Sequence, residues 1–403
     1  MNGLAEARER DRHDPLRRFR GKFHLPRAAY FCGNSLGLQP KATAGAVQDE
    51  LEDWKRLGVE GHLHARHPWL PYHELVTAPM ARVVGAKPGE VVVMNSLTTN
   101  LHLLLVSFYR PTKARHKIIL EKGAFPSDRY ALASQARFHG FDPERTLIEL
   151  SPRPGERTLR EDDILETIDR RGREAALVLF GNVQYLTGQA FDMKAIAAAA
   201  RKKGCAVGFD CAHGAGNLAL NLHDSGADFA AWCSYKYLNA GPGGIGAIFV
   251  HERHARAKLP RFEGWWGTDK KERFLMKPAF DPLPGAEGWQ LSNPPILQLA
   301  ALRASLALFD EAGMRALRRK SEALTGYLET LLRGVPGVEI VTPERRGCQL
   351  SLRLAEPRAK LERRLKAARC VVDFREPDIV RVAPVPLYNT FEDCRRLAEA
   401  LRA

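Results

Sequence analysis

The sequence GFDCAHGAG, residues 208–216, carries the most informative pattern in this chain of 403 residues. An apolar strand pattern ends there at Asp210, and the next such pattern, residues 227–233, leads directly into SYKYLNAGPGGIG at residues 234–246. Asp210 and Lys236 therefore each follow the end of a buried strand. In open α/β sheets ligands bind at the carboxyl ends of the strands, so this pair predicts a functional site rather than a helix cap and a surface lysine.

Around this pair, short apolar runs alternate with amphipathic segments from about residue 91 to residue 250. The strand candidates are KIILE (117–121), RTLIEL (145–150), AALVLF (175–180), CAVGFD (205–210), ADFAAWC (227–233) and GAIFV (246–250). Helical patterns at residues 126–138, 159–171 and 192–203 separate several of them. This alternation predicts an α/β domain with a largely parallel, buried sheet.

The pattern changes after SNPPI, residues 292–296. Helical patterns follow at residues 297–313 and 314–334, and strand candidates follow at residues 338–342, 349–354, 371–375 and 379–383. We expect a large domain over residues 46–295 and a smaller α+β domain over residues 296–403. Residues 1–45 are too few for a domain, so we expect them to pack on the smaller one.

Composition excludes several classes of protein. Hydrophobic residues make up 45% and charged residues 27%, which excludes a wholly disordered chain. No apolar run approaches the roughly 20 residues that cross a bilayer, and the charged start MNGLAEARERDRHDP lacks the apolar stretch of a secretory signal. We therefore expect a cytoplasmic protein that does not enter a membrane.

The net charge of +14 suggests nucleic acid as a partner, but the basic residues are scattered among acids without interleaved aromatics, as in RRGRE and KLERRLK. We expect no nucleic-acid partner. The seven cysteines form no C-x-x-C pair, so neither a zinc knuckle nor a disulfide framework is predicted. Most of them fall within apolar runs, which is typical of small core residues.

Lys236 and Asp210 together indicate pyridoxal 5'-phosphate. A lysine in an apolar, aromatic setting can lose its charge by desolvation and form a Schiff base. An aspartate that keeps a pyridinium nitrogen protonated completes what this cofactor requires. The glycines of residues 241–246 also match the dinucleotide pattern G-x-G-x-x-G, but they lead into a strand instead of opening a helix, which excludes NAD.

A phosphate group needs hydrogen-bond donors, and the segment MNSLTTNLHLLLVSF (94–108) offers them ahead of an apolar helix. A helix N-terminus with free N–H groups binds anions. The candidate residues are Asn95, Ser96, Thr98 and Thr99. Ordinary helix capping by serine or threonine explains the same residues equally well.

At this point the chain resembles kynureninases, a family of fold-type-I pyridoxal phosphate hydrolases related to class V aminotransferases. The resemblance runs from about residue 30 to about residue 390 and rests on YFCGNSLGLQPK (30–41), EGH (60–62), MNSLTTNLHLLL (94–105), AFPSD (124–128), VGFDCAHGAGN (207–217), WCSYKYLNAGPGG (232–244), GWWG (264–267), LSNPPI (291–296) and VRVAPVPLYN (380–389). It implies a fold-type-I, transferase-like α/β architecture and a homodimer with active sites at the subunit interface.

The resemblance also implies an activity. It predicts hydrolysis of L-kynurenine to anthranilate and L-alanine by cleavage of the β,γ carbon–carbon bond, and of 3-hydroxy-L-kynurenine to 3-hydroxyanthranilate. Such a reaction belongs to tryptophan catabolism and to the biosynthesis of NAD, a pyridine nucleotide. The flat aryl group of the substrate suits aromatic side chains such as Phe125 and Trp265.

By matching position, the resemblance makes Lys236 the Schiff-base lysine and Asp210 the partner of the pyridine nitrogen. It assigns further cofactor contacts to Leu97, Thr98, Phe125, Pro126, Ser127, Asp128, His213, Tyr235, Trp265 and Asn293, the last two reaching from the partner subunit. It assigns substrate contacts to Ser35, His62, Asn293 and Arg381, with Arg381 on the α-carboxylate. Tyr235 is our candidate for the acid that protonates the γ-oxygen.

One position departs from the family pattern. Relatives often have a serine or threonine where Gly181 stands, so we expect one cofactor hydrogen bond to be lost or to be supplied by Asn182.

Three alternatives remain. His62, His64 and His67 suggest a metal, but no acid or cysteine of suitable spacing accompanies them, and we predict none. A cysteine desulfurase would use the same Asp–Lys pair with Cys348 as the reactive thiol, but the Ser/Gly-rich loop that it needs is absent. An inactive scaffold or an RNA-binding protein is disfavoured by the intact pair and by the dispersed charge.

Overall fold

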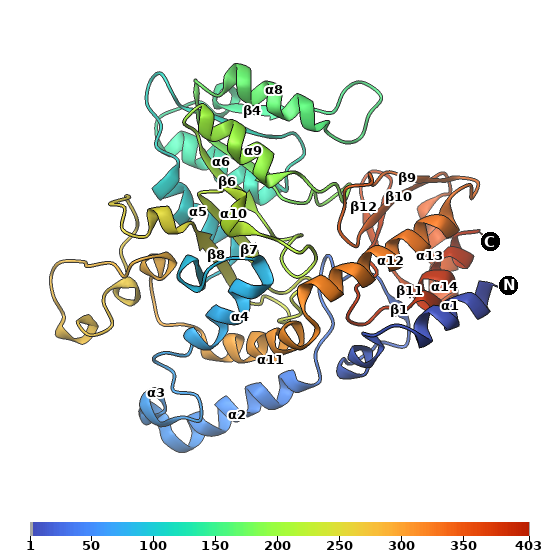
Figure 1. The fold of residues 1–403 in the computed structure, drawn as a ribbon, viewed down its shortest axis with the longest axis horizontal. Coiled ribbons are helices and arrows are strands. Elements are labelled where there is room, and N and C mark those ends of the chain that lie inside the picture. The colour runs from blue at the N-terminus through green and yellow to red at the C-terminus, as the bar shows by residue number, and fades with distance from the viewer. Residues whose placement is uncertain (1–2, 403) are drawn as a thin grey trace.

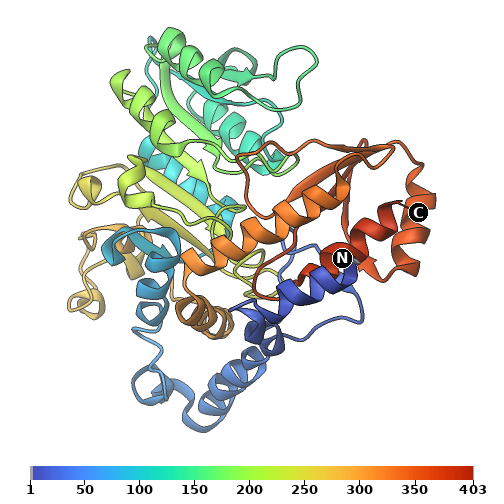
Figure 2. The same cartoon turned by 45° about the vertical axis from the view of Figure 1, so that its right-hand side comes forward.

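The computed structural model describes residues 3–402 and has two parts (Figure 1). A large α/β part lies on the left of the figure and a smaller α+β part on the right, where both chain ends are found. Helix α12 (Met314–Leu332) extends from the large part into the small one, as the turned view of Figure 2 also shows.

The large part is built on a seven-stranded sheet with the order β2-β8-β7-β6-β5-β3-β4. Strands β3 to β7 pair in parallel, whereas β8 is antiparallel to both β7 and β2. This confirms the prediction of a largely parallel sheet, although the short strand β2 was not among the strands expected. The strands are β2 (Val91–Val93), β3 (Lys117–Glu121), β4 (Leu147–Leu150), β5 (Ala175–Gly181), β6 (Ala206–Asp210), β7 (Phe229–Cys233) and β8 (Gly246–Val250).

Both faces of this sheet are buried. In β5 the side chains of Leu177 and Leu179 join one hydrophobic cluster, whereas Val178 and Phe180 join another. Alternate residues of a strand point to opposite faces, so a strand buried on both faces is apolar throughout. The helices of this part are α2 (Ala42–Leu57), α3 (Gly61–His64), α4 (Glu74–Val84), α5 (Leu97–Phe108), α6 (Pro126–Phe138), α7 (Pro143–Thr146), α8 (Glu161–Arg171), α9 (Met193–Lys202) and α10 (Leu222–Ser225).

The small part contains an antiparallel sheet with the order β12-β13-β10-β9 and a separate parallel pair, β1 with β11. Helix α1 packs on α14, and Ala7 belongs to the small core, whereas Leu16, Phe19 and Phe23 belong to the core of the large part. The elements are α1 (Gly3–Arg12), β1 (Ala29–Tyr30), β9 (Val338–Ile340), β10 (Leu350–Leu354), α13 (Arg358–Ala367), β11 (Cys370–Val371), β12 (Asp373–Arg375), β13 (Ile379–Val382) and α14 (Phe391–Arg402).

Helix α11 (Ile296–Ala312) connects the two parts. It packs on α2 and α4, and its buried residues belong to the core beneath the large sheet. The proposed division of the chain into a domain of residues 46–295 and a domain of residues 1–45 with 296–403 stays a prediction. The remaining short elements are the 3-10 helices η1 (Arg17–Lys22), η2 (Gly58–Glu60), η3 (Pro88–Glu90), η4 (Glu252–His254), η5 (Trp265–Gly267), η6 (Arg273–Leu275) and η7 (Ala286–Trp289).

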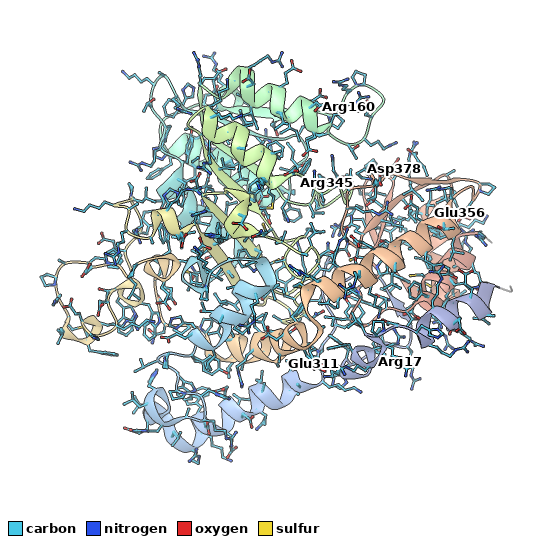
Figure 3. All side chains as sticks on the ribbon, in the orientation of Figure 1. Arg17, Arg160, Glu311, Arg345, Glu356 and Asp378 are labelled. Carbon is cyan, nitrogen blue, oxygen red and sulfur yellow. The ribbon has the colours of Figure 1, made fainter. Side chains whose placement is uncertain are left out.

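Ion pairs also join the two parts at the surface. Arg345, labelled in Figure 3 between the two parts, pairs with Glu161 at 3.2 Å and with Asp192 at 2.9 Å. Exposed pairs of this kind contribute little to stability, about 0–1 kcal/mol each, so the packing of α11 and α12 carries the connection.

Two further predictions concern membranes and cysteines. Within residues 3–402 no helix has the length and apolarity needed to cross a bilayer. All seven cysteines are buried and free, which confirms their interpretation as core residues.

Candidate active site

A cavity of about 180 Å³ lies at the carboxyl ends of the parallel strands. The predicted site residues that line it are Leu97, Thr98, Phe125, Ser127, Asp128, Asp210, His213, Tyr235 and Lys236. The other lining residues are Ser96, Glu121, Gly181, Val183 and Tyr185. Pro126 is the first residue of α6, directly between two lining residues. The sheet therefore brings together most of the cofactor contacts that the sequence predicts.

Lys236 occupies the centre of this arrangement. It follows β7, and the whole residue is only 8% exposed. Its Nζ lies 5.6 Å from the ring centroid of Phe125 and 6.0 Å from that of Tyr235. The aromatic rings inferred from the sequence thus lie beside the amine, and carboxyl groups that line the same cavity interact with it.

Asp210 and Asp128 form a buried carboxyl pair. The Asp210 Oδ1 accepts the backbone N–H of Ala212 at 2.7 Å. Burial raises the pKa of Asp210, while the charge of Lys236 and that N–H oppose the rise. Burial, reinforced by the negative charge of Asp210, raises the pKa of Asp128 well above its usual range. Asp128 is therefore the protonated partner, and it donates its O–H to the Asp210 carboxylate.

Two helix N-termini face the same cavity. Helix α5 begins at Leu97 after the N-cap residue Ser96, and helix α6 begins at Pro126. Ser96, Leu97 and Thr98 all line the cavity, so unpaired N–H groups of the first turn and the Thr98 hydroxyl are available to an anion. This end of the cavity suits a phosphate group.

Flat and neutral side chains line the rest of the cavity. Phe125 contacts Tyr185 edge to face, with ring centroids 5.2 Å apart. Burial, together with the charges of Lys236, Arg381 and Arg375, lowers the pKa of His213 far below its usual value. A neutral imidazole and a phenyl ring are therefore available to stack on a planar ring.

Arg381 lies in the small sheet, on the central strand β13. It is buried, as the sequence pattern predicted, and its Nη1 donates to Tyr185 O at 2.8 Å. Its Nη2 donates to Ser35 Oγ at 2.9 Å and pairs with Asp373, which lies directly opposite across the β12–β13 ladder. The contact with Tyr185, a cavity residue, connects this guanidinium to the site.

Ser35 belongs to the same cluster, because its hydroxyl also bonds to Asp373. Two residues further on, the N–H of Gly37 donates to Tyr235 O at 2.8 Å, so this segment crosses directly over the lysine loop. The predicted substrate contacts Ser35 and Arg381 thus lie together at one side of the cavity.

Three predicted residues lie away from this cavity within the chain. Trp265 is 41% exposed, and Asn293 is exposed as well. His62 packs edge to face on Trp69 with ring centroids 5.5 Å apart. Their expected roles remain predictions, and for Trp265 and Asn293 an exposed position is what a contact with a second subunit requires.

Gly181 lines the cavity, and the hydrogen bond expected from Asn182 stays a prediction. Asn182 is buried, and within the described residues neither polar atom of its side chain has a hydrogen-bond partner. Glu121, the last residue of β3, lies next to Gly181: a Cβ built on Gly181 would be 3.3 Å from Glu121 Oε1.

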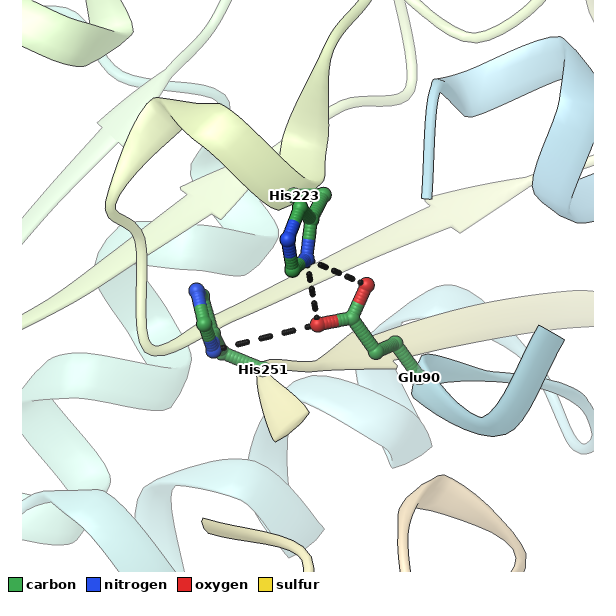
Figure 4. Close-up of side chains that lie close together, drawn as sticks. All are labelled: Glu90, His223 and His251. Carbon is green, nitrogen blue, oxygen red and sulfur yellow. Dashed lines mark hydrogen bonds and ion pairs between the residues drawn. The ribbon is translucent and has the colours of Figure 1, made fainter. Parts of the chain in front are cut away.

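The described residues contain two groups of three metal-ligand side chains, and neither includes His62, His64 or His67. One group is Glu90, His223 and His251 (Figure 4). The Glu90 carboxylate accepts His223 Nδ1 at 2.9 Å and the N–H groups of Lys87 and Glu252, each at 2.9 Å. His251 Nδ1 accepts the N–H of Arg253 at 3.1 Å, so its lone pair is already used. This cluster is a structural hydrogen-bond network.

Cys348, the candidate thiol of a desulfurase, is fully buried, and burial raises its pKa to about 12. A reactive cysteine needs an exposed thiolate. The described structure therefore argues against that alternative.

The residues present fit pyridoxal 5'-phosphate. Lys236 offers an amine, Asp210 a carboxylate for a ring nitrogen, and the start of α5 a phosphate site. Within the described chain, Asp128 Oδ1 and His213 Nδ1 are buried without hydrogen-bond partners. Both atoms can therefore bond to a polar ligand in the cavity.

Comparisons with known proteins agree with this geometry. The family Aminotransferase class-V matches residues 29–359. A kynureninase of Myxococcus xanthus (strain DK1622) is 64% identical over 407 residues, with 98% of this chain and 96% of the relative covered. A kynureninase of Koribacter versatilis (strain Ellin345) is 58% identical, with 97% and 95% covered.

Solved structures share the fold at low identity. A variant of C-DES with glycine covalently linked to its PLP cofactor has a TM-score of 0.81 at 18% identity, with 95% of this chain and 98% of that chain covered. The apo cysteine desulfurase of Thermococcus onnurineus NA1 has a TM-score of 0.77, also at 18% identity, with 98% and 97% covered. These likenesses support the fold-type-I architecture alone. By its near full-length identity to two kynureninases, the chain belongs to the kynureninase family, within the class-V aminotransferases.

Proposed function

We propose that this protein uses pyridoxal 5'-phosphate to hydrolyse L-kynurenine to anthranilate and L-alanine, and 3-hydroxy-L-kynurenine to 3-hydroxyanthranilate and L-alanine. One molecule of water is consumed: its hydroxyl group joins the aryl carbonyl carbon, and the cleaved Cβ gains a proton. The observation that carries the proposal is the identity of 64% to a kynureninase over nearly the whole chain. The cavity with Lys236 and Asp210 supports it.

When bound, pyridoxal phosphate supplies an electron sink for carbanions at Cα and Cβ of the amino acid. Asp210 would hold the proton of the ring nitrogen, because Lys236 and the N–H of Ala212 favour its charged form. Ser96, Leu97 and Thr98 would hold the phosphate at the start of α5. Lys236 Nζ would hold the cofactor through a covalent link and then carry the proton of the substrate Cα.

Tyr235 is the proposed acid for the γ-oxygen. Burial raises the pKa of its phenol, so the O–H stays protonated and available as a donor. It lines the cavity beside Lys236, which places an acid and a base within one site.

Arg381 is the proposed partner of the substrate α-carboxylate. Its guanidinium is already oriented by Ser35 and by the carbonyl of Tyr185. A second positive charge, that of Arg375, lies 3.1 Å from Oδ2 of Asp373, the same oxygen that Arg381 contacts. Two arginines share one aspartate, so the cluster keeps one unbalanced positive charge for an incoming carboxylate.

We also propose a cytoplasmic homodimer in which Trp265 and Asn293 complete the site of the partner. Trp265 belongs to an exposed apolar surface with Phe274, Leu275 and Met276, which are 57%, 64% and 74% exposed. Exposed apolar patches of this kind mark contact surfaces. The seven cysteines are free thiols, as is usual in the reducing cytoplasm. There the reaction would serve tryptophan catabolism or the synthesis of NAD.

The experiment is a product assay on purified protein supplied with pyridoxal phosphate. We expect anthranilate fluorescence to rise with L-kynurenine, with one alanine formed per kynurenine consumed, and no reaction by Lys236→Ala. A yellow, dimeric protein that cleaves neither kynurenine nor its 3-hydroxy derivative would contradict the assignment. Alanine released from cysteine would instead support the desulfurase alternative.

A further inference from the structure

Glu121 is a buried acid in the cavity, and the sequence pattern predicts no role for it. It is the last residue of β3, it is 3% exposed, and it lines the same cavity as Lys236. The N–H of Gly181 donates to its carboxyl group. A Cβ at residue 181 would lie 3.3 Å from Glu121 Oε1, which is a tight contact. Because residue 181 is glycine, the Glu121 carboxyl group has room in the cavity.

Three carboxyl groups then share one buried site with a single lysine. Glu121, Asp128 and Asp210 belong to β3, α6 and β6, and Lys236 is the cation that faces them. Gly181 lies beside Asp210 in the register of β5 and β6, which brings Glu121 and Asp210 to opposite sides of the same glycine. The other titratable groups around Asp210 are His213, Tyr235, Cys211 and Cys233. Burial lowers the pKa of His213 and raises the pKa of the other three, so burial disfavours the charged form of each.

Burial of several like charges around one cation is costly, and the site reduces the cost by keeping acids protonated. Asp210 has the favourable partners: Lys236, the N–H of Ala212 and the O–H of Asp128. Glu121 has only the N–H of Gly181, and burial together with the charge of Asp210 raises its pKa to about 8. The ionised group of the cluster is therefore Asp210.

We propose that Glu121 is a positioning residue which, as a neutral acid in the space left by Gly181, keeps the one negative charge of the cluster on Asp210. The inference rests on the proposed cofactor, because the charge of Asp210 matters most when it faces a pyridine nitrogen. When Glu121 ionises, a second negative charge appears next to Asp210, and the cluster no longer carries a single charged carboxylate. The charge around the bound cofactor therefore changes at alkaline pH, whether or not substrate is present.

The test uses Glu121→Gln, which keeps the shape and neutrality of the protonated acid, and Glu121→Ala, which removes it. Glu149→Gln is the matched control, since Glu149 lies on the neighbouring strand β4, pairs with Arg129 and does not line the cavity. Gly181→Ala serves as a second probe, because its Cβ presses on the same carboxyl group without changing it.

Two measurements are made without substrate. The absorbance of the cofactor-loaded protein is titrated from about pH 6 to about pH 10, and the infrared carbonyl band of protonated carboxyl groups is recorded on the cofactor-free protein. We expect Glu121→Gln to lose one alkaline step of the titration and one protonated-carboxyl contribution, with unchanged cofactor affinity. Gly181→Ala shifts the step, and Glu121→Ala weakens cofactor binding about tenfold.

The inference is overturned if Glu121→Gln keeps the same alkaline step, or if its infrared band equals that of Glu149→Gln. Because neither readout involves kynurenine, a failure here leaves the proposed hydrolysis intact. Conversely, a protein that shows the predicted titration but cleaves no kynurenine would contradict the proposed function alone.

Discussion

Replacing Arg381 by lysine should weaken the binding of the substrate carboxylate. The guanidinium makes three contacts, to Tyr185 O, to Ser35 Oγ and to Asp373. Within the described chain its Nε has no hydrogen-bond partner. Lysine keeps the positive charge but lacks the planar fork that binds a carboxylate through two parallel hydrogen bonds.

The expected magnitude follows from that lost geometry. A charge-assisted hydrogen bond is worth about 1.5–3 kcal/mol, which corresponds to a fall of about 10- to 150-fold in kcat/KM for kynurenine. The fall should appear mainly in KM, because the carboxylate is held in the ground state as well as in the transition state. Cofactor binding should not change, since Arg381 does not line the cavity that holds Lys236.

Steady-state kinetics and the absorbance of bound cofactor provide the assay, with Arg115→Lys as the control. Arg115 donates to Ala175 O at 2.7 Å and to the carbonyls of Gly172 and Lys203, at the opposite edge of the sheet. Its replacement should lower stability without raising KM. An unchanged kcat/KM in Arg381→Lys would refute the role of Arg381, and loss of cofactor in that variant would assign it to the fold instead.

Four further outcomes are expected. Borohydride reduction should attach the cofactor to Lys236, as read by peptide mass spectrometry; a label on another lysine would contradict the site. Asp210→Asn should keep bound cofactor but lose turnover, because an unprotonated pyridine is a poor electron sink, and near-normal turnover would disprove that role. The pKa of Glu121 is raised from 4.5 to about 8 in the folded protein, so its contribution to stability is complete below pH 4.5 and is lost as the pH rises to about 8. Urea unfolding of the cofactor-free protein should therefore show a gap between wild type and Glu121→Gln that changes by about 5 kcal/mol over this range, and a constant gap would contradict the buried neutral acid. Glu90→Ala, which removes the acceptor that joins Lys87, His223 and Glu252, should lower the free energy of unfolding by about 1–3 kcal/mol without changing KM.

Much of the site could be predicted because its residues follow strands. Asp210 ends β6 and Lys236 follows β7, and neighbouring parallel strands bring their carboxyl ends to one edge of the sheet. The apolar runs that predict those strands are strong because both faces are buried. Local pattern and tertiary position therefore agree at these residues.

Other parts depend on contacts that a local pattern does not contain. Glu121 ends the run KIILE as any strand-terminal acid would, and its access to the cavity depends on a missing side chain 60 residues later, at Gly181. Asp373 faces Arg381 only through the register of two short antiparallel strands. Strand β2 has three residues, too few for a periodic signal.

An isotope experiment follows the hydrolysis of the β,γ carbon–carbon bond of kynurenine at this site. The reaction is run in water enriched in ¹⁸O, and the products are analysed by mass spectrometry. We expect anthranilate and L-alanine to form in equal amounts, with ¹⁸O from water in the carboxylate of anthranilate and none in L-alanine. A product that keeps the aryl ketone joined to the three-carbon chain, or kynurenine left unconsumed by the cofactor-loaded protein, would contradict this expectation.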